Sequence, residues 1–217
     1  MSDDLNYGYK GADVPQSFGN NKGVFDPADI NNLVKDDKWT QYGQLEFIET
    51  QSITSSTASM IFSNIQESTY NVHFLTYNNF QAVTNNDRLA LRFFENGVEE
   101  SASVYQIANQ LTFSNRTFVE NKSTTNNHIR LGTNILSSAT NSDNGYAYLY
   151  NLGDSAKYSF STCHTSGMYY NSVQFSSEFG SGVLPQTSTV DEIKLFIPTG
   201  NNIDNLQASL YGIKEYS

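Results

Sequence analysis

Residues 70–77 read YNVHFLTY, and the alternation of their side chains decides the fold class. His73 stands between Val72 and Phe74, so in an extended chain it faces the opposite side from both. A repeat of two residues is typical of a β-strand, whereas a helix repeats every ~3.6 residues. The same period of two begins at Trp39 and continues to the C-terminal region, which predicts an all-β body.

The predicted strands are short and are separated by turns rich in Asn, Gly and Ser. Besides 70–77, they cover residues 45–49, 59–62, 89–94, 103–108, 111–119, 128–135, 146–151, 157–162, 168–175, 190–198 and 208–214. Asn96-Gly97 marks a tight turn, and residues 141–145 are expected to form another hairpin turn. No helical stretch separates the strands, which excludes an alternating β-α-β architecture. The pattern is that of an antiparallel sandwich or barrel, and we expect the β-sandwich, over residues 39–217.

The first 38 residues differ from the rest in pattern. Residues 1–24 contain several glycines and no apolar period, which indicates an extended arm. One short helix is predicted at about 26–37, since Asp26 is a good N-cap and Pro27 suits the first helical position. Its apolar stripe is too short to fold unaided, so it must dock on something. The anchoring residues are expected to be Phe25, Ile30, Leu33, Val34 and Trp39.

Charge and composition exclude several classes of function. Twelve basic residues oppose 22 acidic ones, so the 217-residue chain has a formal net charge of −10. Such a chain repels phosphate backbones, which argues against nucleic-acid binding. No apolar run approaches the roughly 20 residues of a membrane helix, and the first residues lack the pattern of a secretory signal. Cys163 is the single cysteine, which excludes an internal disulfide.

Few side chains have the chemistry of an active site, and none has a partner at the required spacing. Cys163 and His164 resemble a nucleophile and its base, but adjacent strand residues point to opposite faces. His73 and His128 have no neighbour with a metal-ligand spacing. Residues 141–145, NSDNG, lack the leading Asp and the closing Glu of a calcium loop. The sequence therefore predicts no catalytic residue, no metal site and no cofactor.

Tyrosines are concentrated in one predicted strand. Tyr146, Tyr148 and Tyr150 share one face there, and Ala147 and Leu149 take the other. A tyrosine combines an apolar ring with a polar hydroxyl, which suits stacking on sugars and hydrogen bonding to them. The same side chains could instead reach water at the rim of the sandwich or be covered by a neighbouring subunit. The candidate glycan contacts are Tyr146, Tyr148, Tyr150, Tyr169 and Tyr170.

The C-terminal segment 190–214 reads VDEIKLFIPTGNNIDNLQASLYGIK. Its alternating apolar residues 193–197 point inward, Pro198 ends the strand, and residues 200–202 make a turn. Residues 208–212 return on the next strand, and the two strands could form a central pair that closes the sandwich.

Two segments resemble structural proteins of marine and cyanobacterial tailed phages. The first is 16–39, QSFGNNKGVFDPADINNLVKDDKW, which is similar to a short module in front of the body of many phage fibre and appendage proteins. Its matching residues are Ser17, Gly23, Val24, Phe25, Leu33 and Trp39. The second is 190–214, which resembles the ending of their jelly-roll-like β-sandwich domains. Its matching residues are Ile193, Leu195, Ile197, Gly200, Asn201, Leu210, Tyr211, Gly212, Ile213 and Lys214.

The resemblance implies a phage virion structural protein, made in the host cytoplasm and placed on the virion surface. It would be a capsid- or tail-attached decoration, knob, head-fibre or tail-fibre subunit, anchored by its N-terminal arm to another virion protein. By analogy with fibre-like phage proteins it would form a homotrimer. The alternative is a carbohydrate-binding module for host attachment, and both functions are compatible. A glycan depolymerase is the third candidate, and no site supports it.

Overall fold

The computed structural model describes residues 27–36, 45–138, 140–171 and 174–215. The chain divides into two compact units, Met1–Gln44 and Leu45–Ser217, whereas the sequence-based division falls after residue 38. The predicted arm, with Phe25 and Trp39, lies outside the described residues.

The described part of the first unit is one short helix. The helix α1 spans Pro27–Lys35, within the predicted range of about 26–37. On its predicted apolar stripe, Leu33 is buried, Ile30 is half-buried and Val34 is 49% exposed. The stripe therefore has one buried member among the described residues.

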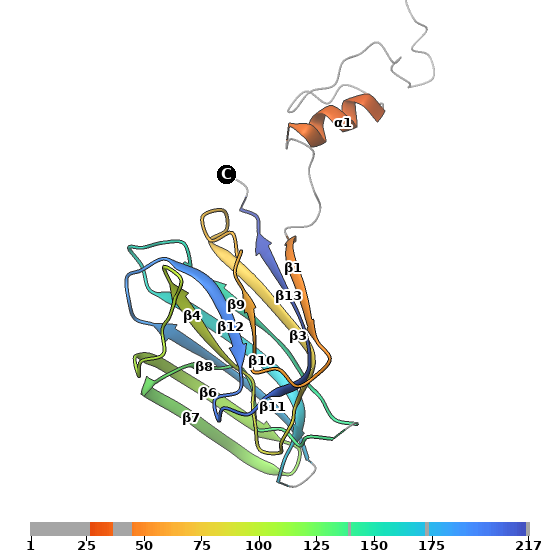
Figure 1. Ribbon diagram of the computed structural model, residues 1–217, viewed down its shortest axis with the longest axis vertical. Coiled ribbons are helices and arrows are strands. Elements are labelled where there is room, and N and C mark those ends of the chain that lie inside the picture. Colours follow the sequence, from red (N-terminus) through yellow and green to blue (C-terminus); the bar gives the residue numbers. More distant parts are fainter. Residues whose placement is uncertain (1–26, 37–44, 139, 172–173, 216–217) are drawn as a thin grey trace, which may run out of the picture. The chain divides into compact units, whose positions relative to one another are not determined.

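The second unit is an antiparallel β-sandwich of two sheets, as predicted (Figure 1). The larger sheet has eight strands, which in spatial order are β1 (Leu45–Ile53), β13 (Ile203–Ile213), β3 (Val72–Ala82), β9 (Asp143–Tyr150), β10 (Ser159–Tyr169), β11 (Gln174–Leu184), β6 (Tyr105–Phe113) and β7 (Arg116–Asn126). The smaller sheet has five strands, which are β2 (Ser59–Phe62), β12 (Val190–Phe196), β4 (Ala90–Glu95) and β5 (Val98–Glu99) in that order, with β8 (Ile129–Arg130) also paired to β4.

The chain crosses repeatedly between the two sheets, which gives the sandwich its jelly-roll-like character. It passes from β3 to β4 and β5, returns through β6 and β7, and crosses again at β8 and at β12. The two C-terminal strands are central, but they do not form the suggested pair. Instead β12 pairs with β2 and β4, while β13 pairs with β1 and β3 in the other sheet. The turn at Gly200, with φ of 88°, lies on the crossing between the sheets.

The inner faces of the two sheets form one hydrophobic core. The larger sheet supplies Leu75 and Leu149, and the smaller sheet supplies Leu91, Phe93 and Leu195, all fully buried. These residues alternate with outward-facing neighbours along their strands, which is the pattern that predicted the fold. Burial of such side chains stabilises the fold by roughly 1.5–3 kcal/mol each.

Local turns account for the differences from the predicted strands. The tight turn at Asn96-Gly97 is confirmed, and both residues have positive φ, 52° and 73°. The strand predicted at 111–119 is instead the end of β6 and the start of β7, joined by a two-residue loop at 114–115. The strand predicted at 168–175 contains another reversal, between β10 and β11.

Two stretches with weak apolar alternation proved to be strands. Residues 176–184, SSEFGSGVL, lie in β11, where a Cβ added at Gly180 would lie 2.4 Å from Asn109 and one at Gly182 would lie 3.0 Å from Ile129. Gly180 therefore leaves no room for a side chain, and Gly182 leaves little. The turn expected at residues 141–145 is wrong, because Asp143 already begins β9. In both places contacts with other strands, and not the local sequence, determine the conformation.

Candidate functional site

A row of aromatic side chains crosses four adjacent strands on the outer face of the larger sheet, which is the face turned away from the core. The ring of Phe47 on β1 lies 5.9 Å from that of Tyr211 on β13. Tyr211 in turn lies 6.3 Å from Phe74 on β3, and Phe74 lies 4.7 Å from Tyr148 on β9. These four residues, here called the aromatic row, are paired in the register of the sheet. They form a continuous aromatic surface.

The three tyrosines of β9 extend this surface along the strand. Tyr146, Tyr148 and Tyr150 lie on the outer face, as the sequence predicted, while Ala147 and Leu149 are fully buried. The ring centroids of Tyr146 and Tyr148 are 6.0 Å apart, and those of Tyr148 and Tyr150 are 6.5 Å apart. Three of the five candidate glycan contacts are therefore brought together.

The other two candidate glycan contacts lie away from this surface. Tyr169 ends β10 with the same inward parity as Thr165, and its ring packs 4.9 Å from that of Phe113. Tyr170 follows the end of the strand, with its ring 4.9 Å from Tyr169. The structure therefore places Tyr169 on the opposite face of the sheet from the tyrosines of β9.

Beyond Tyr148 the aromatic row gives way to small residues. In register with Tyr148 lie Thr162 of β10, Ser181 of β11 and Ala108 of β6, all exposed. Because these side chains are short, the surface is lower here than over β9 and β3. They form the floor of a shallow trough.

Larger side chains stand on both sides of this floor. On β10, Thr162 lies between Phe160 and His164, which are two residues away on the same face. On β11, Ser181 is flanked in the same way by Phe179 and Val183. Phe160 and Phe179 are 44% and 47% exposed, so their rings are accessible from solvent. The sequence alone does not indicate these flanking residues, because their alignment depends on the register between strands.

Four adjoining depressions make the trough continuous. The largest, of about 580 Å³, is lined by residues that include Tyr148, Thr162 and Phe179. It shares Phe179 and Ser181 with a depression of about 480 Å³ toward β7, and Tyr146 with one of about 340 Å³ toward β3. A fourth, of about 330 Å³, adjoins them over β10, β11 and β6. The trough therefore crosses β3, β9, β10, β11, β6 and β7.

Hydrogen-bonding groups accompany the aromatic rings. Tyr150 Oη lies 3.2 Å from Thr162 Oγ1, and His164 Nε2 lies 2.8 Å from Ser177 Oγ. Among the described residues that line the four depressions, only Glu120 and Lys122 are acidic or basic besides the histidine. Those two side chains are exposed and form an ion pair at 3.0 Å. The described lining of the trough therefore consists mainly of rings, hydroxyls and amides, and its one acidic and one basic side chain offset each other.

The structure does not bring the side chains of the cysteine and histidines considered from sequence together. Cys163 faces the core, where burial raises the pKa of its thiol to about 12, while His164 points to the outer face. His73 is fully buried beside the carbonyl of Ile65, and burial lowers its pKa. Burial and three nearby arginines lower the pKa of His128 to about 3. Cys163 and His164 thus point to opposite faces, as expected of neighbours in a strand.

A polar cluster that the sequence did not predict lies inside the sandwich. Arg130 Nε is 2.6 Å from Glu178 Oε1, and the Glu178 side chain is fully buried. Asp143 is also fully buried, with Thr165 Oγ1 donating to its Oδ1 at 2.7 Å. Burial, with Glu178 adding to the effect, raises the pKa of Asp143 to about 8. These two acids lie on the inner face, so they do not reach a ligand in the trough.

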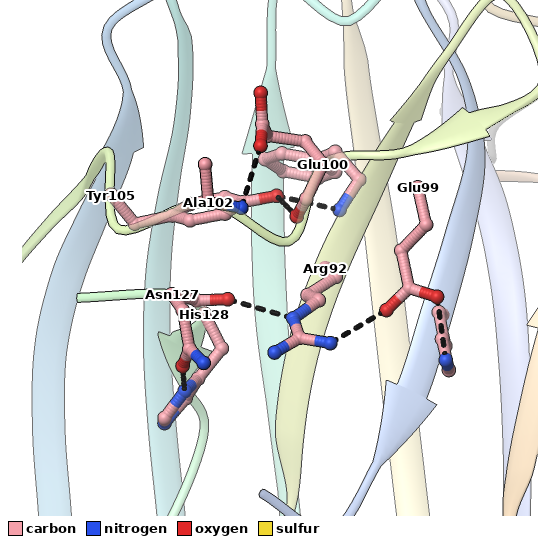
Figure 2. Close-up of polar contacts among 9 residues, drawn as sticks. Arg92, Glu99, Glu100, Ala102, Tyr105, Asn127 and His128 are labelled. Atoms are coloured by element: carbon pink, nitrogen blue, oxygen red, sulfur yellow. Dashed lines mark hydrogen bonds and ion pairs between the residues drawn. The ribbon is translucent and has the colours of Figure 1, made fainter.

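Charged side chains gather instead on the smaller sheet (Figure 2). There Arg92 donates from Nε to the carbonyl of Asn127 at 2.7 Å and from Nη1 to Glu99 at 2.7 Å. Lys194 Nζ lies 2.7 Å from the second oxygen of Glu99, and Arg92 also lies over the ring of Phe196, 4.4 Å from its centroid. Figure 2 shows Arg92 between Glu99 and Asn127. The hydrogen bonds of Arg92 to these two residues link β4 to β5 and to the segment after β7. The two sheets thus present chemically different surfaces.

Within the described residues, no three His, Cys, Asp or Glu side chains gather as a metal-binding group. The described helix is far too short to cross a membrane. Comparison with known proteins finds no protein-family model and no curated protein sequence that matches this chain.

Proposed function

We propose that this chain is a phage virion surface protein that attaches to host glycans through the outer face of its larger sheet. The observation that supports glycan binding is the aromatic row, which leads into an uncharged trough between Phe160 and Phe179. Aromatic rings stack on the apolar faces of sugar rings, and hydroxyl and amide groups pair with sugar hydroxyls.

The exposure of this surface favours a binding function. Phe160, Phe179 and Tyr146 are each more than a third exposed on the same face of one sheet. A large contiguous apolar patch on a soluble protein usually marks an interaction site, because its exposure to water is unfavourable. The abundance of Tyr, Ser, Thr and Asn here suits a polar ligand better than the core of an obligate protein interface.

The virion assignment rests on the resemblance of residues 16–39 and 190–214 to phage structural proteins. In this proposal the first unit, Met1–Gln44, is the anchor, and α1 contributes Leu33 and the half-buried Ile30 to it. The partners are another capsid or tail protein and further copies of the chain, as a homotrimer. The second unit projects outward and presents the trough.

Glycan binding is tested with the full chain on an array of host and other bacterial polysaccharides. Binding is expected, and Tyr148→Ala is expected to weaken it because the ring lines the largest depression of the trough. The matched control is Tyr170→Ala, a tyrosine outside the trough, which should bind as the parent does. An array without signal, or equal effects of the two substitutions, would contradict the proposal. Mass spectrometry of purified particles tests the virion location separately.

A further inference from the structure

The shape of the trough indicates the size of its ligand, if the proposed glycan-binding function holds. The four depressions adjoin across six neighbouring strands. The floor row itself runs in register from Tyr148 on β9 to Lys122 on β7, which is five strands. Strands in a sheet lie about 4.8 Å apart, so these four spacings give a length of about 19 Å. A single sugar would occupy only a small part of this length. The trough suits several consecutive units of a linear chain that lies across the strands.

The charge distribution indicates the chemistry of that ligand. The trough has no unpaired acidic or basic side chain among its described lining residues, apart from His164. The chain as a whole has a net charge of −10, so an anionic polymer would be repelled on approach. Among the described lining residues, a sulfated, uronate or sialic acid polymer would also find no arginine or lysine without an acidic partner to pair with. Charge complementarity therefore favours an uncharged ligand.

The lining residues indicate how such a ligand would be held. Phe160 and Phe179 rise on opposite sides of the floor formed by Thr162 and Ser181. Two rings separated by a hydroxyl-lined floor present apolar faces and hydrogen-bonding groups alternately, as a neutral sugar does. Gln110, which lines the depression toward β7, adds an amide.

We infer that the trough binds a linear, uncharged polysaccharide laid across the strands, with Phe160 and Phe179 as its stacking platforms. The inference rests on the proposed function and names the ligand class of the same site. It assigns specificity to the lack of charge in the trough and affinity to the two phenylalanines.

The experiment uses the full chain on an array that holds neutral glucans, mannans and galactans beside uronate, sialic acid and sulfated polymers. Neutral polysaccharides are expected to bind, and their affinity should change little between about 50 and 500 mM NaCl because no charge pairs form. Phe179→Ala is expected to weaken binding roughly tenfold. The matched control is Phe118→Ala, which removes a 64% exposed phenylalanine on β7 that lines none of the four depressions.

A second pair of variants tests whether the polysaccharide lies on the floor of the trough. Ser181→Phe fills the trough and should abolish binding, whereas Ser52→Phe adds the same ring at an exposed site on β1 and should not. Circular dichroism confirms that each variant is folded.

The possible failures are distinguishable. Binding of acidic polymers alone, weakened by salt, would overturn the inference and leave the proposed function intact. No binding of any glycan would overturn both. Light scattering that shows an oligomer of the full chain dissociated by Phe179→Ala would mean that a second copy covers the trough, and would overturn the inference.

Discussion

Asp143 allows a test of whether the interior of the sandwich keeps a buried carboxyl group protonated. Its carboxyl group is fully buried, and the only hydrogen bond to its side chain that involves another described side chain comes from Thr165. Both oxygens are close to glycines: a Cβ added at Gly132 would lie 2.5 Å from Oδ2, and one at Gly167 would lie 2.6 Å from Oδ1. The surroundings leave little room for water, so the neutral acid is favoured over the carboxylate.

The size of the effect follows from the pKa. Burial raises the pKa of Asp143 from an ordinary 3.8 to about 8 in the folded chain. Below pH ~4 the Asp143 carboxyl group is protonated in both the folded and the unfolded chain, so its full contribution to the stability of the fold is present. As the pH rises toward ~8, the unfolded chain releases the proton first, and this contribution is lost. At 1.36 kcal/mol per pKa unit, the loss between pH ~4.5 and pH ~7 is about 3 kcal/mol.

Asp143→Asn removes the titration while keeping the shape of the side chain. Urea unfolding followed by circular dichroism at pH ~4.5 and pH ~7 should show the variant gaining about 3 kcal/mol relative to the parent over this interval. The control is Asp154→Asn, because the backbone N–H of Ala156 lowers the pKa of that carboxyl and the dependence has the opposite sign. Parallel curves for Asp143→Asn and the parent would refute the reasoning, since they would mean that the carboxyl is ionised in the folded chain.

Three further results are expected. Arg130→Met leaves the buried Glu178 carboxylate without its ion-pair partner and should lower the free energy of unfolding in urea by about 3–5 kcal/mol. Methionine at both positions should recover most of this stability. A loss below ~1 kcal/mol for Arg130→Met would contradict the buried pair. Gly180→Ala presses a methyl group against Asn109 and should cost about 1–3 kcal/mol, seen as a lower melting temperature; an unchanged melting temperature would contradict this packing. Deletion of residues 1–38 should keep the β-type spectrum and most of the melting temperature but prevent incorporation into virions, and full incorporation would place the anchor in the sandwich.

Features that depend on local alternation could be predicted from the sequence. The shared face of Tyr146, Tyr148 and Tyr150 follows from a period of two within a single strand, and no partner strand changes it. The tight turn at Asn96-Gly97 is equally local, because both residues tolerate positive φ.

The trough itself could not be predicted in this way. Its floor combines Thr162, Ser181 and Ala108, which come from three strands whose neighbours and register are set by the topology of the sheet. The sequence makes Tyr169 a candidate beside the tyrosines of β9, but its position in β10 turns it to the other face. The sequence predicts a turn at Asp143, because the Asn, Ser and Gly residues around it have strong turn preferences. The pairing of β9 with β3 and β10 overrides these preferences.

The central claim is that the outer face of the larger sheet is a glycan-binding surface. The most direct measurement is a crystal structure of the full chain soaked with an oligosaccharide from the neutral polysaccharide that binds best. The account predicts density for several sugar units across the strands, with rings stacked on Phe160 and Phe179 above Ser181. Density confined to another surface of the molecule, with the trough of the same crystal open to solvent, would contradict it.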